Sequence, residues 1–272
     1  MYRYANGTDS ENNKLTTDSS IFIASVSKQF CAACIMLLRD KGKLNLNDML
    51  SKYYPEYKIG GKITIKNLLS MRSGIMNMDD NVFPDNISEK NTETENIAAV
   101  KRWLFKQPLE FKRDKSYGYS NSNYFLLSDI IEQVSGKKYH DFVREFIFKP
   151  LGMKNTGFVS ELSDNPEWAK KLVKYDSLPV LKFKGLMNGA VDIISDGEEM
   201  IMWLNGLSKG IIVSKKTLGE MTKDYSGDDG PALGYGYGLM EMPNGGYGHN
   251  GIISVYSSVD YIHEKAAARF LE

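Results

Sequence analysis

The sequence has no excess of charge of either sign, because 34 Lys and Arg residues match 34 Asp and Glu residues. A nucleic-acid-binding protein usually has a basic surface, so this balance gives no support to such a partner. Long hydrophobic runs are also absent, since the longest strictly apolar run, Phe30 to Leu38, is too short to span a bilayer. The opening residues MYRYANGT do not read as a signal peptide. We therefore expect one large domain or two interleaved ones, with no membrane span.

Cysteine is scarce, because Cys31 and Cys34 are the only two, and this excludes a disulfide-based secreted scaffold. Their C-x-x-C spacing also occurs in redox and metal sites. Here two alanines separate them inside the apolar run, where positions i and i+3 share a helical face. We favour buried structural thiols over a redox or metal role. No His, Cys and Asp set has ligand spacing, so no metal or organic cofactor is expected.

Helical periodicity dominates the middle of the chain. From about Ser25 to Asp40 the apolar residues recur on one face, and Gly42 ends the pattern. A later helix, SDGEEMIMWLNGL, has Ser195 as its expected N-cap and Glu198 at capping-box spacing. The other predicted helices lie within residues 44–57, 63–75, 94–107, 117–136 and 139–153.

The last quarter of the chain changes to the two-residue period of strands. GYGYGLMEM is read as one strand, residues 245–246 as a Gly-Gly turn, and YGHNGIISVYSSVDYI as the second strand. Residues 1–8 are read as the end of a further strand. We therefore predict an α+β fold in which an antiparallel sheet is assembled from both chain ends, with a helical lobe inserted. The residues expected on one face of the second strand are Ile253, Val255, Val259 and Tyr261.

A serine and a lysine stand at the start of the apolar run, in IASVSKQF. Ser25 and Lys28 are spaced i, i+3, which places the lysine one helical turn from the serine on the same side. A serine becomes a good nucleophile when a base takes its proton, and a lysine in an apolar pocket has a lowered pKa and can be that base. The free N–H groups of a helix start also favour a developing oxyanion.

The pattern S-x-x-K is weak by itself. Ser135 and Lys138 match it as well, but they flank Gly136 at a helix end, where a turn with solvated lysines is expected. For Ser25, the alternative is an N-cap serine beside a lysine whose stem is buried and whose head reaches water. The pattern alone leaves both interpretations open.

Two further groups could take part in the same chemistry. In YGYSNSNY, Tyr119 precedes Asn121 by two residues. A phenol beside a lysine cation can have a lowered pKa and relay protons, and an amide can hold a nucleophile and a substrate carbonyl. A packed tyrosine in an Asn-rich turn is the alternative. In GHNG, His249 would supply a cation or donor, Gly251 would let a substrate lie close to the strand edge, and the N–H of Ile252 could hold an oxyanion.

Only three histidines are present, and His249 is the one in such a setting. If a protonated His249 holds a substrate carboxylate, binding of such substrates should weaken as pH rises through about 6.5. His140 lies on an amphipathic helix and His263 stands beside Glu264, so both are expected to be structural or surface groups.

These groups occur in the order S-x-x-K, Y-x-N, H-x-G, and the segments around them follow the same order. On these motifs, the chain resembles the serine beta-lactamase and penicillin-binding-protein superfamily, on its class C-like branch. That branch also includes D-alanyl-D-alanine carboxypeptidases, D-aminopeptidases and esterases. The H-x-G form is typical of the peptidase and esterase relatives, which makes a dedicated beta-lactamase less expected.

The resemblance implies roles for two sets of residues. The catalytic set is Ser25 as acylated nucleophile, Lys28 as its proton partner and Tyr119 as a second proton-transfer group. The substrate-binding set is Asn121, His249, Gly251 and Ile252. Which of Lys28 and Tyr119 is the general base stays open. The implied function is acyl-enzyme hydrolysis of an amide or ester, such as a D-Ala-D-Ala-type cell-wall peptide, a beta-lactam or a small ester.

The resemblance covers about residues 1–262, which we expect to form one domain. Its α/β part would comprise residues 1–50 and 185–262, and its helical lobe about 51–184. Residues 263–272, HEKAAARFLE, lack strand alternation and resemble a vector-derived or frame-shifted tail. Family members carry further terminal strands and helices, so we expect some of these to be missing, with unpaired sheet edges. A location in the cell envelope is what the resemblance suggests.

The missing strands also motivate an alternative of a different class. In this interpretation the chain is a non-catalytic or truncated family member that acts as a peptide- or penicillin-binding module.

Overall fold

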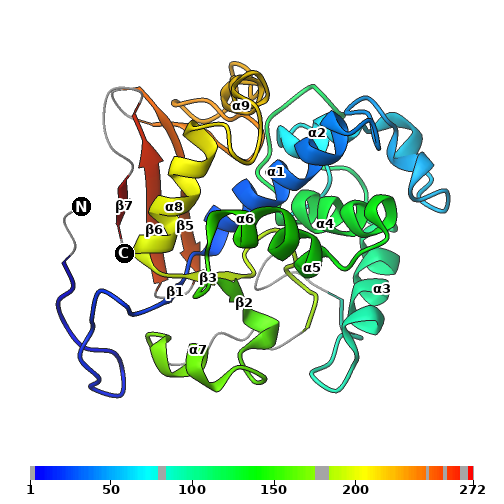
Figure 1. Cartoon of the computed structure of the whole chain (residues 1–272). Coiled ribbons are helices and arrows are strands. Elements are labelled where there is room, and N and C mark those ends of the chain that lie inside the picture. Colours follow the sequence, from blue (N-terminus) through cyan, green and yellow to red (C-terminus); the bar gives the residue numbers. More distant parts are fainter. Residues whose placement is uncertain are drawn as a thin grey trace.

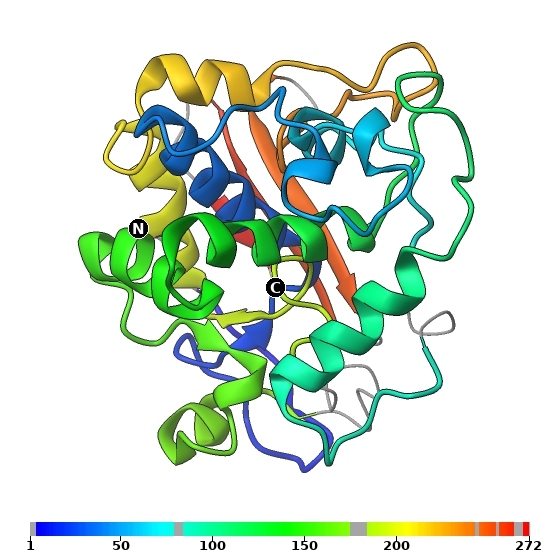
Figure 2. The ribbon, with the colours of Figure 1, turned by 90° about the vertical axis from the view of Figure 1, so that its right-hand side faces the viewer.

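The computed structural model describes residues 4–78, 84–174, 184–242, 245–253, 256–263 and 269–271. An antiparallel sheet forms one side and helices form the other, and helix α1 (Ser27–Asp40) runs between them (Figure 1, Figure 2). One hydrophobic core extends through both sides. The predicted α+β class with antiparallel sheets is confirmed.

Helix α1 is buried on every side from Ser27 to Met36. The sequence predicted a single apolar face, but a helix packed between two layers buries all of its faces. Phe30 stacks on Trp203 of α8 (Gly197–Ser208), with ring centroids 4.1 Å apart. The two cysteines of α1 are buried free thiols, as predicted. Helix α1 therefore connects the sheet side to the helical side.

Two of the other predicted helices begin and end close to their predicted signals, whereas the helix predicted at residues 63–75 covers only Ile65–Leu69 and residues 44–57 form only the helical turn Leu50–Lys52. Helix α4 (Asn121–Ser135) is followed by Gly136 at φ 71°, a conformation that glycine adopts readily. Helix α3 (Glu93–Leu104) begins with a capping box of Thr92 and Glu95. The remaining helices are α2 (Ile65–Leu69), α5 (Tyr139–Val143), α6 (Lys149–Leu151), α7 (Pro166–Lys171) and α9 (Lys215–Thr222). The short turns are η1 (Ala24–Val26), η2 (Leu50–Lys52), η3 (Gly60–Lys62), the π-helical η4 (Arg144–Phe148) and η5 (Val159–Glu161). None of the helices in the described residues is both long and apolar enough to cross a membrane.

The strands form two antiparallel sheets. The three-stranded sheet has the order β1-β3-β2 and joins an early segment to two later ones. The four-stranded sheet has the order β4-β5-β6-β7, and all of its strands come from the last part of the chain. Helix α8 packs against β6 and β7 (Figure 1). The strands are β1 (Ile21–Phe22), β2 (Gly157–Phe158), β3 (Ile193–Ser195), β4 (Met240–Glu241), β5 (Tyr247–Ile253), β6 (Tyr256–Ile262) and β7 (Arg269–Leu271).

The stretch predicted as one long second strand is a hairpin of two strands, because Ile253 pairs with Tyr256. Val259 and Tyr261 do share one face of β6, but it is the less buried face. Val255 lies outside the described residues. Only Ser254 and Val255 stand between the two strands in the sequence, and a single serine without Gly, Pro, Asn or Asp is a weak turn signal.

Three other local predictions were wrong. The N-cap of α8 is Asp196, whose side chain accepts the N–H of Glu199, while Ser195 is the last residue of β3. Within residues 263–272, predicted to lack strand character, β7 pairs with β6. Of the predicted strand at residues 1–8, the described part makes only an isolated bridge from Thr8 to Lys14.

Candidate active site

Ser25 lies in the tight turn η1 between β1 and α1. Its side chain is partly exposed, whereas Ala24 and Val26 on either side are buried. Ala24 has a φ of 47°, in the left-handed region that costs a non-glycine residue about 1–2 kcal/mol. Neither η1 nor α1 has a side-chain hydrogen bond at its N-cap, so the alternative that Ser25 caps the helix is wrong.

Lys28 is completely buried one turn after Ser25. Its Nζ donates to Ser25 Oγ at 3.0 Å, to Asn121 Oδ1 at 2.8 Å and to the Ala190 carbonyl at 3.0 Å. These contacts use all three donors of an ammonium group, and none of the acceptors is a carboxylate. Burial lowers the pKa of Lys28 to about 7, against the opposing effect of nearby acidic groups. An amine with this pKa can take a proton from Ser25 near neutral pH.

The second S-x-x-K match has none of these features. Ser135 Oγ bonds to the backbone of Lys137, within the turn after α4. Lys138 is half-exposed and pairs with Glu132 at 3.2 Å. The prediction of a turn with solvated lysines is confirmed.

Asn121 reaches Lys28 from the first residue of α4. Its backbone N–H donates to Asn77 Oδ1 at 2.7 Å, and its Nδ2 donates to the Met78 carbonyl at 3.3 Å. The Nδ2 bond holds the side-chain amide with Oδ1 turned toward Lys28, and the backbone bond fixes the start of α4. The structure brings the S-x-x-K and Y-x-N motifs together although 93 positions separate Lys28 from Asn121.

Tyr119 covers Lys28 from the same side as Asn121. The Lys28 Nζ lies 4.9 Å from the centre of the Tyr119 ring. The Tyr119 hydroxyl is buried and makes no well-formed hydrogen bond within the described residues. Burial raises the pKa of Tyr119, and the nearby Ser25 side chain offsets this only in part. The expectation of a lowered phenol pKa is wrong because desolvation outweighs the other effects.

His249 reaches the same group of residues from β5, and only 1% of it is exposed. Its ring centroid lies 6.3 Å from that of Tyr119 and 5.8 Å from that of Tyr235. Burial, followed by the charge of Lys28, lowers the pKa of His249 to about 3. The expected titration of a protonated His249 near pH 6.5 is therefore wrong, and the ring is neutral at neutral pH.

Gly251 packs against the turn that carries the serine. A Cβ built on Gly251 would lie 2.3 Å from the Ile23 carbonyl oxygen and 3.1 Å from the Ala24 Cβ. Ser258 on β6 fixes the same carbonyl through a 2.8 Å hydrogen bond. Strand β5 thus needs glycine here to approach η1, a packing role that the sequence analysis did not predict.

Ile252 follows on the open edge of β5, and 68% of it is exposed. Backbone N–H groups alternate between the two sides of a strand. The N–H of His249 faces β6, where it donates to the Asp260 carboxyl at 2.9 Å, so that of Ile252 faces the opposite edge. In the described part of the chain, β4 pairs on that side only with Tyr247 and Gly248. The N–H of Ile252 is therefore available on an open edge.

Sequence reasoning missed several groups around these residues. The Ala190 carbonyl that binds Lys28 is a backbone atom with no sequence signal. Tyr235, whose hydroxyl lies 3.4 Å from His249 Nε2, stands in the repeated GYGYG, which could have marked it. Asp260 is an acidic residue at an inward-facing strand position, a pattern that often indicates function.

Asp260 belongs to a buried hydrogen-bond network beneath His249. Trp203 Nε1 donates to Gln29 Oε1 at 2.7 Å, and Gln29 Nε2 donates to Asp260 Oδ1 at 2.6 Å. Burial raises the pKa of Asp260 to about 7, despite these donors. The network joins α8, α1 and the β5–β6 hairpin.

Two other features offer no comparable chemistry. His140 is partly buried, stacks on Phe158 at 3.8 Å and bonds to Asp192 at 3.2 Å, which fits the predicted structural role. Across the described residues, no three His, Cys, Asp or Glu side chains gather as a metal site.

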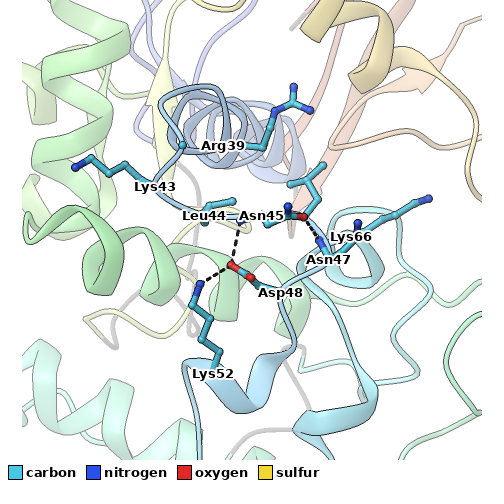
Figure 3. A pocket seen from close by; sticks show the side chains of 10 residues that line it. Arg39, Lys43, Leu44, Asn45, Asn47, Asp48, Lys52 and Lys66 are labelled. Atoms are coloured by element: carbon cyan, nitrogen blue, oxygen red, sulfur yellow. Dashed lines mark hydrogen bonds and ion pairs between the residues drawn. The ribbon is translucent and has the colours of Figure 1, made fainter.

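A surface hollow after α1 is rich in cations (Figure 3). In it Asp48 accepts hydrogen bonds from Lys52 and from the Asn45 backbone, while Lys43 and Lys66 point away from each other. Its charged groups do not converge on one point, so we place the candidate site at Ser25.

Comparison with known proteins agrees with this geometry. The family model described as Beta-lactamase matches residues 1–270. The putative penicillin-binding protein PbpX of Bacillus subtilis (strain 168) is 32% identical over 254 residues, which are 89% of this chain and 58% of that protein. Penicillin-binding protein 4* of the same strain is 35% identical over 148 residues, 54% of this chain and 32% of that protein. The chain thus spans less than two thirds of the length of these curated relatives.

Solved structures show the same fold. The D-amino acid amidase from Ochrobactrum anthropi SV3 has a TM-score of 0.81 at 26% identity, covering 97% of this chain and 81% of that one. The penicillin binding protein from Bacillus halodurans has a TM-score of 0.82 at 18% identity, covering 98% and 86%, and supports the fold alone. Together these matches confirm the resemblance that the three motifs indicated. The chain belongs to the beta-lactamase family.

Proposed function

We propose that this chain is a serine hydrolase that cleaves an amide or ester through an acyl-enzyme on Ser25. The observation that carries the proposal is the 3.0 Å contact between Ser25 Oγ and the Nζ of Lys28, a buried lysine with a pKa of about 7. A partly exposed hydroxyl beside a buried amine is the arrangement that activates a serine nucleophile. The name of the structural neighbour D-amino acid amidase supports an amide substrate.

Acylation would begin when neutral Lys28 takes the proton of Ser25 while Oγ attacks the substrate carbonyl carbon. The backbone N–H groups of Ser25 and Ile252 would hold the developing oxyanion. As the C–N or C–O bond breaks, the proton would pass from Lys28 through the Tyr119 hydroxyl to the leaving group. The high pKa of Tyr119 suits a relay through a protonated phenol.

Deacylation would use the same groups. Water would attack the acyl carbon, lose a proton to Lys28, and release the acid as Ser25 recovers its proton. Asn121 would orient the substrate with its Nδ2, the amide atom that does not face Lys28. Lys28 is the better candidate for the base, because its lowered pKa favours the neutral amine whereas burial keeps Tyr119 protonated.

Labelling with a fluorophosphonate probe, read by intact mass, tests the proposal. We expect one equivalent of probe on the folded protein, no labelling of Ser25→Ala, and unchanged labelling of Ser135→Ala. The second variant is a matched control because it removes the serine of the other S-x-x-K pattern. An unmodified mass in a folded sample, or labelling that survives Ser25→Ala, would contradict the proposal.

A substrate panel separates turnover from binding alone. It comprises a chromogenic cephalosporin, a short-chain nitrophenyl ester and a D-Ala-D-Ala peptide. Release of product at catalytic amounts of protein supports a hydrolase. A stable penicilloyl adduct on Ser25 without release from any of the three would instead support the penicillin-binding module.

A further inference from the structure

Both ring nitrogens of His249 are already in use. Nδ1 contacts the Asn250 carbonyl, and a carbonyl only accepts, so the proton of the neutral ring must lie on Nδ1. Nε2 is then an acceptor, and the Tyr235 hydroxyl lies 3.4 Å from it. A ring in this state has no free N–H to offer a ligand. An acceptor nitrogen repels a carboxylate rather than binding it.

The groups packed around His249 hold it in this neutral state. Lys28 on α1 is a nearby cation that opposes a second positive charge. Tyr119 and Tyr235 present an aromatic ring and a hydroxyl. On β6 the Asp260 carboxyl binds the backbone N–H of His249 and not its ring. Burial removes the water that would stabilise an imidazolium.

Among the described residues, Lys28 is the one cation whose charge acts on His249. No other lysine or arginine of the described residues hydrogen-bonds to Ser25 or Tyr119 or lies over the Tyr119 ring. The three protons of Lys28 point to Ser25, Asn121 and Ala190, so none is free for a ligand. A substrate carboxylate beside the scissile bond would therefore lose its hydration without gaining a charged partner.

We propose that this site selects substrates that are uncharged beside the scissile bond, such as neutral amides and esters, and discriminates against those whose leaving group ends in a carboxylate. The inference rests on the proposed function, since it concerns the leaving group of the same acyl-transfer step. The site would therefore favour simple amides and esters over peptides that end in a free D-alanine carboxylate.

Two thioesters that differ only in this charge provide the test. One joins N-acetyl-D-alanine to mercaptoacetamide and the other joins it to mercaptoacetate, and thiol release reports kcat/KM for each. We expect the neutral thioester to be favoured by about ten-fold or more. The ratio should be the same at about pH 5.5 and about pH 8.5, because His249 does not titrate between them and the requirement for neutral Lys28 scales kcat/KM of both thioesters alike.

A gain-of-charge variant sharpens the experiment. His249→Lys should shift the ratio toward the mercaptoacetate ester by about ten-fold. His263→Lys, which makes the same substitution at the end of β6, should leave the ratio unchanged. The inference is overturned if the wild-type protein cleaves the mercaptoacetate ester equally well or better, or gains preference for it as pH falls. Release from neither thioester contradicts the proposed function itself.

Histidine side-chain ¹⁵N shifts give a readout that needs no turnover. His249, assigned by its loss in His249→Gln, should keep the neutral Nδ1–H form from about pH 5 to about pH 9. A titration of this ring above about pH 5.5 would overturn the inference even if the acyl-enzyme forms.

Discussion

Lys28 must be neutral to accept the proton of Ser25, and its pKa of about 7 lies within reach of ordinary assays. Below that pH the ammonium form dominates, so we expect kcat/KM on a neutral ester to fall as pH decreases and to level off above about pH 7. Lys28→Arg, which stays charged, should lose about 10²-fold or more in kcat/KM. Lys138→Arg is the matched control and should behave like the wild type.

A profile that stays flat from about pH 5 to about pH 8 would contradict Lys28 as the base. So would a Lys28→Arg variant with wild-type kcat/KM.

At the scale of single residues, the sequence predicted which side chains lie together but not their protonation states. Ser25, Lys28, Tyr119 and Asn121 were found from motif order and helical spacing, and the structure brings them together. The phenol pKa of Tyr119 and the neutral ring of His249 were not foreseen. Both depend on burial by distant segments, and desolvation has no local sequence signal.

Three elements converge on Asp260, so its ionisation should affect the β5–β6 hairpin. Its pKa is about 7 in the fold, against 3.8 for an exposed aspartate. Between these values the native protein binds more protons than the unfolded chain, so the free energy of unfolding falls as pH rises. We expect a loss of up to about 4 kcal/mol across this window, which Asp260→Asn should abolish.

Urea unfolding at several pH values measures this slope. Asn is a close match in shape and keeps an Oδ1 acceptor for Gln29 Nε2 and the His249 N–H. Equal slopes for Asp260→Asn and the wild type would show that the carboxyl does not resist ionisation in the fold.

The contact between β5 and η1 leads to a second prediction for an element. Gly251→Ala places a Cβ 2.3 Å from the Ile23 carbonyl oxygen, so it should destabilise the protein by about 2–3 kcal/mol and displace the Ser25 turn. Gly219→Ala on α9 is the matched control, because nothing lies within 4 Å of its Cβ. An exposed helical glycine replaced by alanine should gain about 0.5–1 kcal/mol.

Thermal unfolding and labelling by the fluorophosphonate probe check both variants. A Gly251→Ala protein with wild-type stability and labelling would show that β5 can move away from η1 without consequence.

Helices and strands were predicted where a helix-breaking or turn residue, or a hydrophobic period, marks them in the sequence. Gly136 ends α4, and residues 245–246 form the turn before β5, as expected. The split between β5 and β6 was missed because Ser254, without Gly, Pro, Asn or Asp beside it, is only a weak turn signal. Asp196 and Ser195 are both good caps by propensity, and the pairing of β3 with β1 and β2 decided between them.

For the whole molecule, the central position of α1 predicts where stability is greatest. Helix α1 is packed between the sheet side and the helical side, whereas α7 has no buried residue. In native-state hydrogen exchange, the amides of α1 should exchange only through global unfolding, and those of α7 through local opening. Comparable protection of the two helices would contradict the prediction that stability is greatest at α1.

The order of the motifs along the chain was sufficient to predict that three distant segments meet at one place. Lys28 and Asn121 meet through the packing of α1 on α4, and β5 reaches the same place from the other end of the sequence. The division into an α/β part, a helical lobe and a tail remains a prediction. Two adjoining parts that share one core leave no linker for the sequence to mark.

The three hydrogen bonds of Lys28 have a further consequence for its neutral form. An amine has two N–H donors and one lone pair, so one of the three contacts must reverse when the proton leaves. The oxygens of Asn121 and Ala190 cannot donate, which leaves the Ser25 hydroxyl as the only partner that can turn its hydrogen toward nitrogen. Deprotonation alone thus aims the lone pair at the nucleophile, and no side chain has to rotate.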